Sequence, residues 1–247
     1  MTNLYKLKGK TAWITGGKRI GQRVAEVLAL HGANIVLSYR NSRKEADVTL
    51  ENIKKFGVDG MSIRADVSSR ESVAEAVNKI KKRFRKIDIL VLMASIFEPA
   101  KLDSITDDDL RKNFDVHVLG TFLPVRESLS LMPQGSHIIT VSDRTAVGKM
   151  HSGYLLYIIT KGAVASLTKA LAAELAPKGI FVNSIAPGPV LKAENMSIEY
   201  WSRIRKNSII KYPITDKEAV EEFAKLVLYL STARSTGSVY PLDFGWL

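Results

Sequence analysis

The chain has 247 residues and no cysteine, which leaves room for one large domain and excludes disulfides, thiolate catalysis and zinc–sulfur sites, so no metal site is expected. Lys and Arg number 36 against 25 Asp and Glu, a formal net charge of +11. These basic residues are spread out without a nucleic-acid recognition motif, which favours a solvated basic surface over nucleic-acid binding. No apolar run approaches the roughly 20 residues of a membrane span, and no signal peptide is evident, so a cytoplasmic protein is expected.

Short apolar runs alternate with amphipathic stretches along the whole chain. Strands are expected at residues 11–17, 34–40, 61–68, 87–95, 137–143, 180–188 and 237–245. Helices are expected at 20–32, at 71–84, from the polar segment 103–110 to about 132, from the tyrosine-rich stretch at 153–162 to about 176, and at 216–231. This order predicts a single α/β domain over residues 1–247, with a doubly wound, mostly parallel sheet covered by helices on both faces.

A glycine-rich turn, TGGKRIG at residues 15–21, lies between the first expected strand and its helix. Glycines there let the backbone approach a pyrophosphate, which the N-terminus of the helix stabilises. The spacing departs from GxGxxG, so an ordinary strand–helix turn is the alternative. The candidate phosphate-binding residues are Gly16, Gly17, Lys18, Arg19, Ile20 and Gly21.

The end of the second expected strand indicates which nicotinamide cofactor the chain binds. An acid at that position would bind the ribose hydroxyls, but the chain has Arg40 followed by Asn41. Because an arginine can bind a 2′-phosphate through two hydrogen bonds, NADP(H) is favoured over NAD(H). Asp66 and Val67 follow the third strand and are expected near the adenine, although Asp66 could equally cap the next helix.

The stretch GYLLYIITKG, residues 153–162, carries Tyr154, Tyr157 and Lys161 on one helical face. A carbonyl that is reduced by hydride needs a proton, and a free tyrosine with a pKa of about 10 donates or accepts it reluctantly at neutral pH. A lysine one turn away is expected to lower the pKa of Tyr157 toward the working range. The alternative is that the tyrosines only line a contact between helices.

The chain resembles the short-chain dehydrogenase/reductase family over nearly its whole length. The resemblance rests on the turn at 15–21, ADV at 65–67, YxxxK at 157–161, VNSIAPGPV at 182–190 and TGSVYPLDFG at 236–245. It implies that Tyr157 is the catalytic acid, that Lys161 also holds the nicotinamide ribose, and that the protein is a homo-oligomer, a tetramer or a dimer. Further cofactor-binding residues implied by the resemblance are Ala94, Ser95, Pro187, Gly188 and Val190.

Several positions depart from the family pattern. Asp143, preceded by Ser142, stands where the family has its serine, Ala-Ser replaces Ala-Gly at residues 94–95, and His117 replaces an asparagine. These departures resemble the pteridine reductase branch, where an Asp–Tyr pair is thought to relay protons to a pterin nitrogen and a phenylalanine stacks on the pterin. Phe97 matches that phenylalanine, with a core or lid position as its alternative. Asp143 could instead be a structural cap, with Ser142 taking the serine's role.

The expected function is therefore that of an NADPH-dependent oxidoreductase that transfers hydride to a small-molecule carbonyl or imine-type substrate, with a pterin as one candidate. A 3-oxoacyl or general ketone reductase is the first alternative, and a non-catalytic NADP(H)-binding scaffold is the second. Tyr154 should face the substrate or pack. Residues 190–215 are expected to close over the substrate as a lid.

Overall fold

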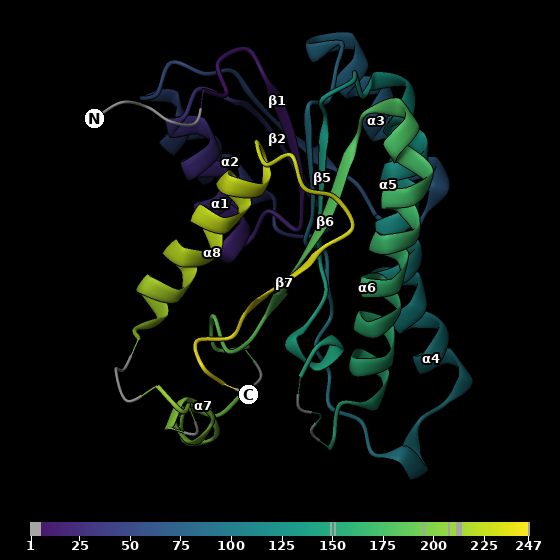
Figure 1. Cartoon of the computed structure of the whole chain (residues 1–247), viewed down its shortest axis with the longest axis vertical. Helices are drawn as coiled ribbons and strands as arrows, with labels where there is room; N and C mark the ends of the chain where they lie inside the picture. Colours follow the sequence, from purple (N-terminus) through teal and green to yellow (C-terminus); the bar gives the residue numbers. More distant parts are fainter. Residues whose placement is uncertain are drawn as a thin grey trace.

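The computed structural model describes residues 6–148, 150, 152–194, 196–206, 208–210 and 214–246. Seven strands form one parallel sheet in the order β3-β2-β1-β4-β5-β6-β7 (Figure 1). The strands are β1 (Thr11–Thr15), β2 (Asn34–Tyr39), β3 (Gly60–Arg64), β4 (Ile89–Leu92), β5 (His137–Val141), β6 (Phe181–Pro187) and β7 (Val239–Leu242). The sequence-based prediction of a single, doubly wound α/β domain is confirmed, and the pairing of these seven strands is parallel throughout.

Helices cover both faces of the sheet (Figure 1). One face carries α1 (Ile20–Leu30), α2 (Arg43–Lys54) and α8 (Asp216–Leu230). The other face carries α3 (Arg70–Phe84), α5 (Gly120–Ser128) and α6 (Leu155–Leu175), with α4 (Asp107–Phe114) leading into α5. The short helix α7 (Ile198–Lys206) lies away from both layers.

The strands are buried on both faces because their side chains alternate between two apolar cores. Ile14 and Leu37 face the core beneath α1 and α8, whereas Trp13 and Val36 face the core beneath α3 and α5. All four side chains are fully buried. Burial of each such side chain contributes roughly 1.5–3 kcal/mol, so this alternation is what fixes the register of the central strands.

The strand order reverses between β1 and β4, which is where open α/β sheets bind their ligands. Gly16 turns the chain directly after β1 with a φ of 73°, a conformation that favours glycine. A Cβ at Gly16 would lie 3.0 Å from backbone atoms of Met93 and Ala94 after β4. Glycine therefore lets the two strand ends lie close together at the edge of the crevice.

Two helices were not expected from the sequence, and one expected helix is divided. α2 buries only Ala46, Thr49 and Ile53, so its apolar periodicity is weak. The expected helix up to residue 132 consists of α4, a π-helical turn at Asp115–Leu119, and α5. The segment Leu155–Lys178, mainly α6, is long and apolar enough to cross a membrane by length and composition, but half of its most apolar window is buried and it packs on β5 and β6.

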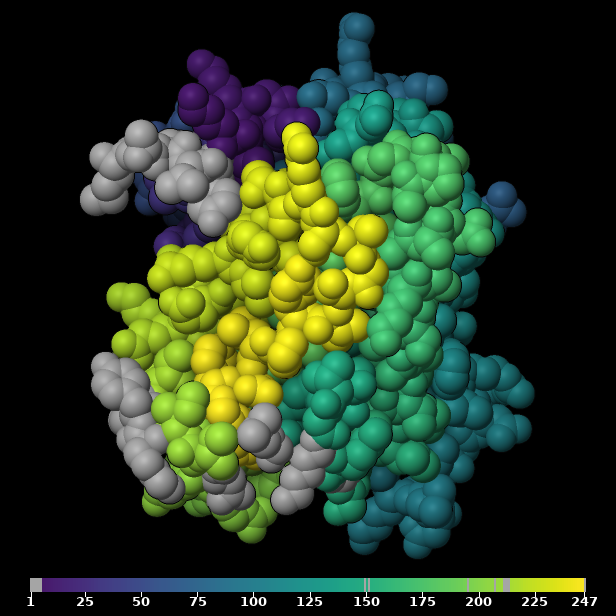
Figure 2. All heavy atoms as spheres, in the orientation of Figure 1, coloured from purple at the N-terminus to yellow at the C-terminus, as the bar shows by residue number. Residues whose placement is uncertain are grey.

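The C-terminal segment lies on the surface between α8 and α6 (yellow in Figure 2). After β7, backbone carbonyls of the C-terminal segment accept hydrogen bonds from the residues that follow α7. The amide of Ile209 donates to the carbonyl of Gly245 at 2.9 Å, and the hydroxyl of Ser208 donates to that of Phe244 at 2.7 Å. The indole of Trp246 donates to the carbonyl of Ile204 within α7. This network fixes α7 beside the carboxyl ends of the strands.

Candidate active site

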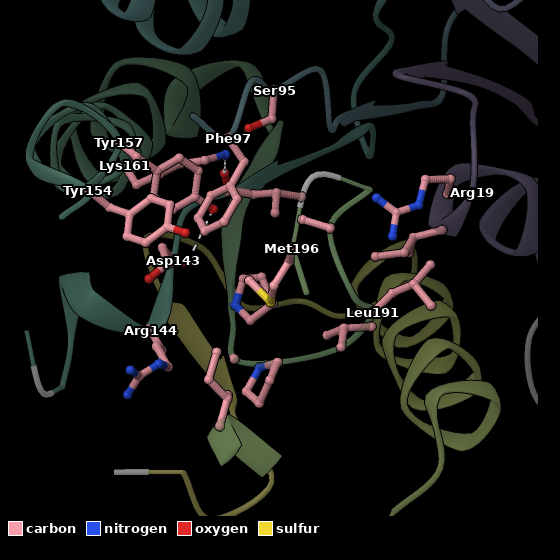
Figure 3. Close-up of a pocket in the computed structure, with 18 of the residues that line it drawn as sticks. Arg19, Ser95, Phe97, Asp143, Arg144, Tyr154, Tyr157, Lys161, Leu191 and Met196 are labelled. Carbon is pink, nitrogen blue, oxygen red and sulfur yellow. Dashed lines mark hydrogen bonds between the residues drawn. The ribbon is translucent and has the colours of Figure 1, made fainter. Parts of the chain in front are cut away.

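A cavity of about 1140 Å³ opens at the carboxyl ends of the strands (Figure 3). It brings together predicted residues from the turn after β1, the loop after β4, the end of β5, α6 and the loop after β6. The predicted residues that line it are Gly16, Lys18, Arg19, Ile20, Ser95, Phe97, Asp143, Tyr154, Tyr157, Lys161, Pro187, Gly188 and Val190. The remaining predicted residues lie outside its lining: Gly17, Gly21, Arg40, Asn41, Asp66, Val67, Ala94 and Ser142.

The glycines of the turn act through close packing. A Cβ on Gly21 would lie 2.5 Å from the carbonyl oxygen of Gly16, and a Cβ on Gly17 would lie 3.1 Å from Leu37. Ala94 is held from the neighbouring strand, because its amide donates to the hydroxyl of Thr15 at 3.3 Å. These contacts bring α1 and the two strand ends close together, as a backbone cradle for phosphates requires.

The N-terminus of α1 suits an anionic group. It has no acidic residue in its first turn and no side-chain cap, whereas α3, α4 and α8 each have both. Its cap residue, Arg19, has a φ of 59°, which a non-glycine residue rarely adopts. No acid or side-chain cap therefore competes with an anion at this end of α1, where the amides of Gly21 and Gln22 donate to the carbonyls of Lys18 and Arg19 at 3.2 and 3.1 Å. The residues present fit the pyrophosphate of a dinucleotide.

Cations at this end of the cavity already have protein partners. Lys18 forms ion pairs with Glu194 at 2.8 Å and with Glu45 at 3.6 Å, and hydrogen bonding to Glu194 raises the pKa of Lys18. The guanidinium of Arg19 donates to the carbonyl of Lys192. The loop after β6 is thus tied to the turn after β1.

Arg40 was expected to have no acid beside it, and the structure corrects this. Its Nε lies 3.2 Å from a carboxylate oxygen of Asp66, which the sequence places 26 residues away but the sheet brings to the adjacent strand end. Arg40 remains exposed, with 64% of its side-chain surface accessible. Asp66 also accepts hydrogen bonds from the amide and hydroxyl of Ser68, so it shapes the turn before α3. Val67 is buried against Gly120 of α5.

Asp143, and not Ser142, faces the tyrosine of the YxxxK motif. The hydroxyl of Tyr157 donates to Oδ2 of Asp143 at 3.2 Å. Oδ1 accepts from the amide and the hydroxyl of Thr145 at 2.9 and 2.8 Å, which fixes the carboxylate. Ser142 is fully buried and donates to the carbonyl of Ile185 in β6.

The charges around Tyr157 differ from the expectation. Lys161 lies 5.6 Å from the ring centroid of Tyr157 and donates to the carbonyl of Val141 at 2.8 Å. Burial lowers the pKa of Lys161 to about 8. Burial and the Asp143 carboxylate raise the pKa of Tyr157 well above 10. The predicted lowering of the tyrosine pKa by Lys161 is therefore wrong for these side chains, because desolvation and a nearby anion both favour the neutral phenol.

Aromatic rings form one wall of the cavity. Phe97 stacks on Tyr154 with ring centroids 4.4 Å apart and meets Tyr157 edge-on at 4.8 Å (Figure 3). The loop that carries Phe97 is tied to the start of α6, since the amide of Ala100 donates to the carbonyl of Gly153 at 3.0 Å. The two predicted substrate residues, Phe97 and Tyr154, thus lie together beside the predicted acid.

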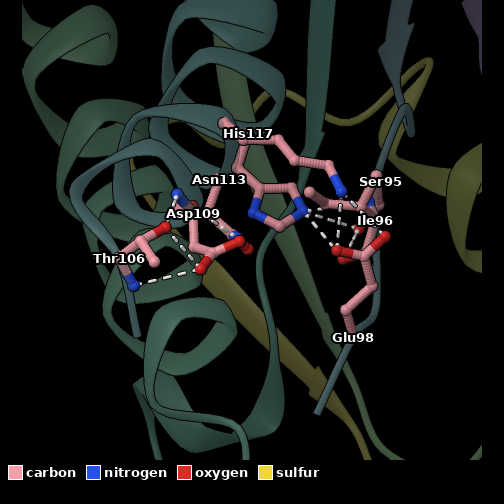
Figure 4. Close-up of polar contacts among 8 residues, drawn as sticks. Ser95, Ile96, Glu98, Thr106, Asp109, Asn113 and His117 are labelled. Atoms are coloured by element: carbon pink, nitrogen blue, oxygen red, sulfur yellow. Dashed lines mark hydrogen bonds and ion pairs between the residues drawn. The ribbon is translucent and has the colours of Figure 1, made fainter. Parts of the chain in front are cut away.

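His117 meets Tyr157 of this wall edge-on, with ring centroids 5.6 Å apart, and was noted in the sequence only as a departure from the family pattern. Figure 4 shows its polar contacts. Thr160 already donates its hydroxyl proton to the carbonyl of Leu156 at 2.7 Å, so Nδ1 of His117, 2.8 Å away, must be the donor to Thr160. On the other side of the ring, Nε2 accepts from the amide of Ile96 at 3.2 Å and lies 2.9 Å from the hydroxyl of Ser95 and 3.1 Å from the carbonyl oxygen of Ile96.

This histidine holds its hydrogen bonds as a neutral group. Burial, together with the charge of Lys161, lowers the pKa of His117 to about 3. Because the imidazole stays neutral at ordinary pH, it positions the loop at Ser95–Ile96, directly before Phe97, and does not exchange protons. α4, which precedes it, begins with a reciprocal hydrogen-bond pair between Thr106 and Asp109 (Figure 4).

Sequence analysis missed several residues of the cavity lining, and two of them bear on its chemistry. The first is Arg144, whose position directly after Asp143 was the available signal, and the second is Trp246 near the C-terminus. Within the described part of the expected lid, residues 190–194, 196–206, 208–210 and 214–215, the structure places Glu194, Met196 and Tyr200 in the lining. Trp201 also lines the cavity, but it is buried and its indole donates to Asp216 at 3.3 Å.

Comparison with known proteins agrees with this geometry. A model of the enoyl-(acyl carrier protein) reductase family matches residues 16–246. A versicolorin reductase of Emericella nidulans is 34% identical over 75% of this chain and 71% of its own, and a short-chain dehydrogenase/reductase of Pestalotiopsis microspora is 32% identical over 74% and 70%. A short-chain dehydrogenase of Burkholderia cenocepacia, solved in complex with NADP, superposes with a TM-score of 0.90 over 98% of this chain and 99% of its own, at 29% identity. The chain therefore belongs to the short-chain dehydrogenase/reductase family and is an oxidoreductase.

Proposed function

We propose that the protein is an NADPH-dependent reductase that transfers a hydride to a carbonyl or imine-type bond of a flat ring compound. The observation that carries this proposal is the Tyr157–Asp143 hydrogen bond, which lies in one cavity with Lys161 and with the phosphate-binding end of α1. The NADP complex of the Burkholderia relative supports the choice of cofactor. Arg40, exposed at the end of β2, is the residue proposed for the 2′-phosphate, which would compete with Asp66 for its guanidinium.

When bound, the nicotinamide supplies the hydride. The turn at Gly16 and the first turn of α1 would hold the pyrophosphate, and Lys161 would hold the ribose. Tyr157, kept as a neutral phenol, donates its proton to the substrate oxygen or nitrogen as hydride reaches the carbon. Asp143, once protonated from solvent, then returns a proton to the resulting phenolate of Tyr157. One hydride and one proton are thereby added to the double bond.

Asp143 and the aromatic wall favour a pterin among flat substrates. A carboxylic acid can pass a proton through Tyr157 to a ring nitrogen, and the stacked pair Phe97–Tyr154 offers an aromatic surface to a ring. The resemblance to the pteridine reductase branch supports this choice. The second candidate is a ketone reductase, which the relatives named versicolorin reductases favour.

The described part of the lid supports closure over the cofactor site. Glu194 and the carbonyl of Lys192 contact Lys18 and Arg19 of the phosphate turn. We infer that this contact rearranges when the dinucleotide binds, since phosphates and Glu194 would compete for the same cation.

The test is a substrate screen that follows loss of NADPH absorbance with dihydropterins, quinones, ketones and acyl thioesters. Asp143→Ala should abolish most of the pterin reduction, whereas Ser142→Ala, the matched control on the adjacent residue, should retain much of it. Equal losses in the two variants would refute the Asp143 relay. Tight NADPH binding without turnover of any of these compounds would favour the non-catalytic scaffold.

A further inference from the structure

Arg144 is a buried cation in the wall of the cavity. It begins the short helical turn Arg144–Ala146 after Asp143, and only 6% of its surface is exposed. Among the residues that the structure describes, no carboxylate forms an ion pair with it. A buried guanidinium without a paired anion is costly, which makes its position in the cavity informative.

Among the described residues, Arg144 has a hydrogen-bond acceptor for one of its five donors. One nitrogen, Nη1, donates to the carbonyl of Trp246 at 3.1 Å, and the guanidinium stacks over the indole ring at 3.6 Å from its centroid. In the described part of the chain, His137 Nδ1 is the one buried side-chain nitrogen or oxygen that lacks a partner. The other donors of Arg144 are therefore not sealed in protein, and Arg144 contributes to the lining of the cavity.

The nearby carboxylates have hydrogen-bond partners other than Arg144. Asp143 accepts from Tyr157 and Thr145, and Asp243 accepts from the amide of Gly245 at 3.0 Å. Burial lowers the pKa of the Arg144 guanidinium, and the charges of Asp143 and Asp243 offset only part of that effect. Aromatic rings, among them Tyr154 and Trp246, line the cavity beside it and strengthen any charge interaction there.

We propose that Arg144 binds a carboxylate of the substrate, so that the enzyme prefers carbonyl or imine compounds that carry this anionic group. The stacked indole holds the guanidinium plane, and a planar carboxylate can then accept two parallel hydrogen bonds from its free edge. This inference rests on the proposed function, because it takes the same cavity as the substrate site. It adds a specificity-determining residue to the proton donors Tyr157 and Asp143.

The experiment compares two ligands of the same shape, naphthalene-2-carboxylate and its neutral amide. Their dissociation constants are measured by calorimetry on protein saturated with NADP⁺. The wild-type protein should bind the acid about tenfold or more tightly than the amide, as expected for a charge-assisted hydrogen-bond pair. Arg144→Gln should bring the ratio of the two constants close to one. Arg203→Gln, at an exposed arginine that also lines the cavity, is the matched control and should leave the ratio unchanged.

The ratio separates recognition from a structural role. If Arg144 only anchors Trp246, Arg144→Gln should weaken both ligands alike, and that result would overturn the proposal. A wild-type protein that binds acid and amide equally would also overturn it, even if Arg144→Gln does not fold. Arg144→Lys, which keeps the charge without the planar fork, should give a ratio between those of the other two proteins. If the protein reduces neutral ketones but does not prefer the acid, the Arg144 proposal fails and the proposed reductase function stands. If it prefers the acid but reduces no carbonyl compound, the reductase function fails and the Arg144 proposal stands.

Discussion

Replacing Lys161 with methionine should make the protein more stable while abolishing its activity. Lys161 is 3% exposed, and burial lowers its pKa from 10.5 to about 8. That difference corresponds to about 3 kcal/mol of folding free energy lost at neutral pH, because the charged amine is desolvated on folding. Methionine keeps an apolar stem of similar length but loses the charge-assisted hydrogen bond to the carbonyl of Val141, which offsets about 2 kcal/mol. The expected net gain at pH 7 is roughly 1 kcal/mol.

The stability difference between Lys161→Met and the wild type should depend on pH. Between about pH 8 and 10.5 the unfolded chain holds a proton on Lys161 that the folded protein has released. The stability of the wild-type protein therefore rises with pH across this range, by about 1.4 kcal/mol per pH unit from this group alone. The advantage of Lys161→Met should be full at pH 7 and should shrink steadily above pH 8.

The assay is urea unfolding of the protein without added cofactor, because a bound dinucleotide would stabilise the wild type selectively. Wild type, Lys161→Met and Lys169→Met are compared at pH 7 and about pH 9.5. Lys169 is the matched control, since it lies exposed on the same helix. A Lys161→Met protein less stable than the wild type at pH 7, or a stability gap that does not change with pH, would refute the desolvation argument.

Three further outcomes follow from the same geometry. Tyr157→Phe should reduce turnover by about two to four orders of magnitude and keep NADPH affinity, whereas Tyr154→Phe should reduce turnover much less. Steady-state kinetics that show the reverse would contradict the assignment of the acid. Arg40→Ala should weaken NADPH about tenfold or more but NADH little, as titrations by fluorescence can show, and an equal loss for both would exclude its contact with the 2′-phosphate. His117→Leu should lower the free energy of unfolding by about 1–3 kcal/mol, because it leaves the amide of Ile96 without its acceptor. It should not shift the pH–rate profile, and a shifted profile would show that His117 exchanges protons.

The sheet could be predicted from the sequence because its central strands are buried on both faces and therefore appear as continuous apolar runs. The same signal fails for α2, whose buried stripe consists of Ala46, Thr49 and Ile53. A helix whose fully buried stripe holds one large apolar side chain, with Leu50 only partly buried beside it, resembles a polar loop in sequence. α7 was missed for a similar reason, since Trp201 is its one buried side chain among the described residues.

The site was predictable where neighbours in the sequence are also neighbours in space. Tyr157 and Lys161 lie one helical turn apart, and the motif therefore places them together without knowledge of the fold. The choice between Ser142 and Asp143 depends on where β5 ends, because successive residues face opposite sides of a strand. The contact between Arg144 and Trp246 joins residues 102 positions apart, so no local pattern could indicate it.

The π-helical turn at Asp115–Leu119 limits how this region can change in length during evolution. A π-helical turn holds about one residue more than an α-helical turn, and it is the spare residue that sets the direction of His117 relative to α5. Loss of a single residue here would let the chain continue as a regular α-helix without an interruption. The preceding helix would nevertheless rotate by about 100° around its axis, and the imidazole would leave Ser95 and Ile96. A substitution such as His117→Leu removes individual contacts, whereas an insertion or deletion at these positions would change the shape of the cavity wall in a single step.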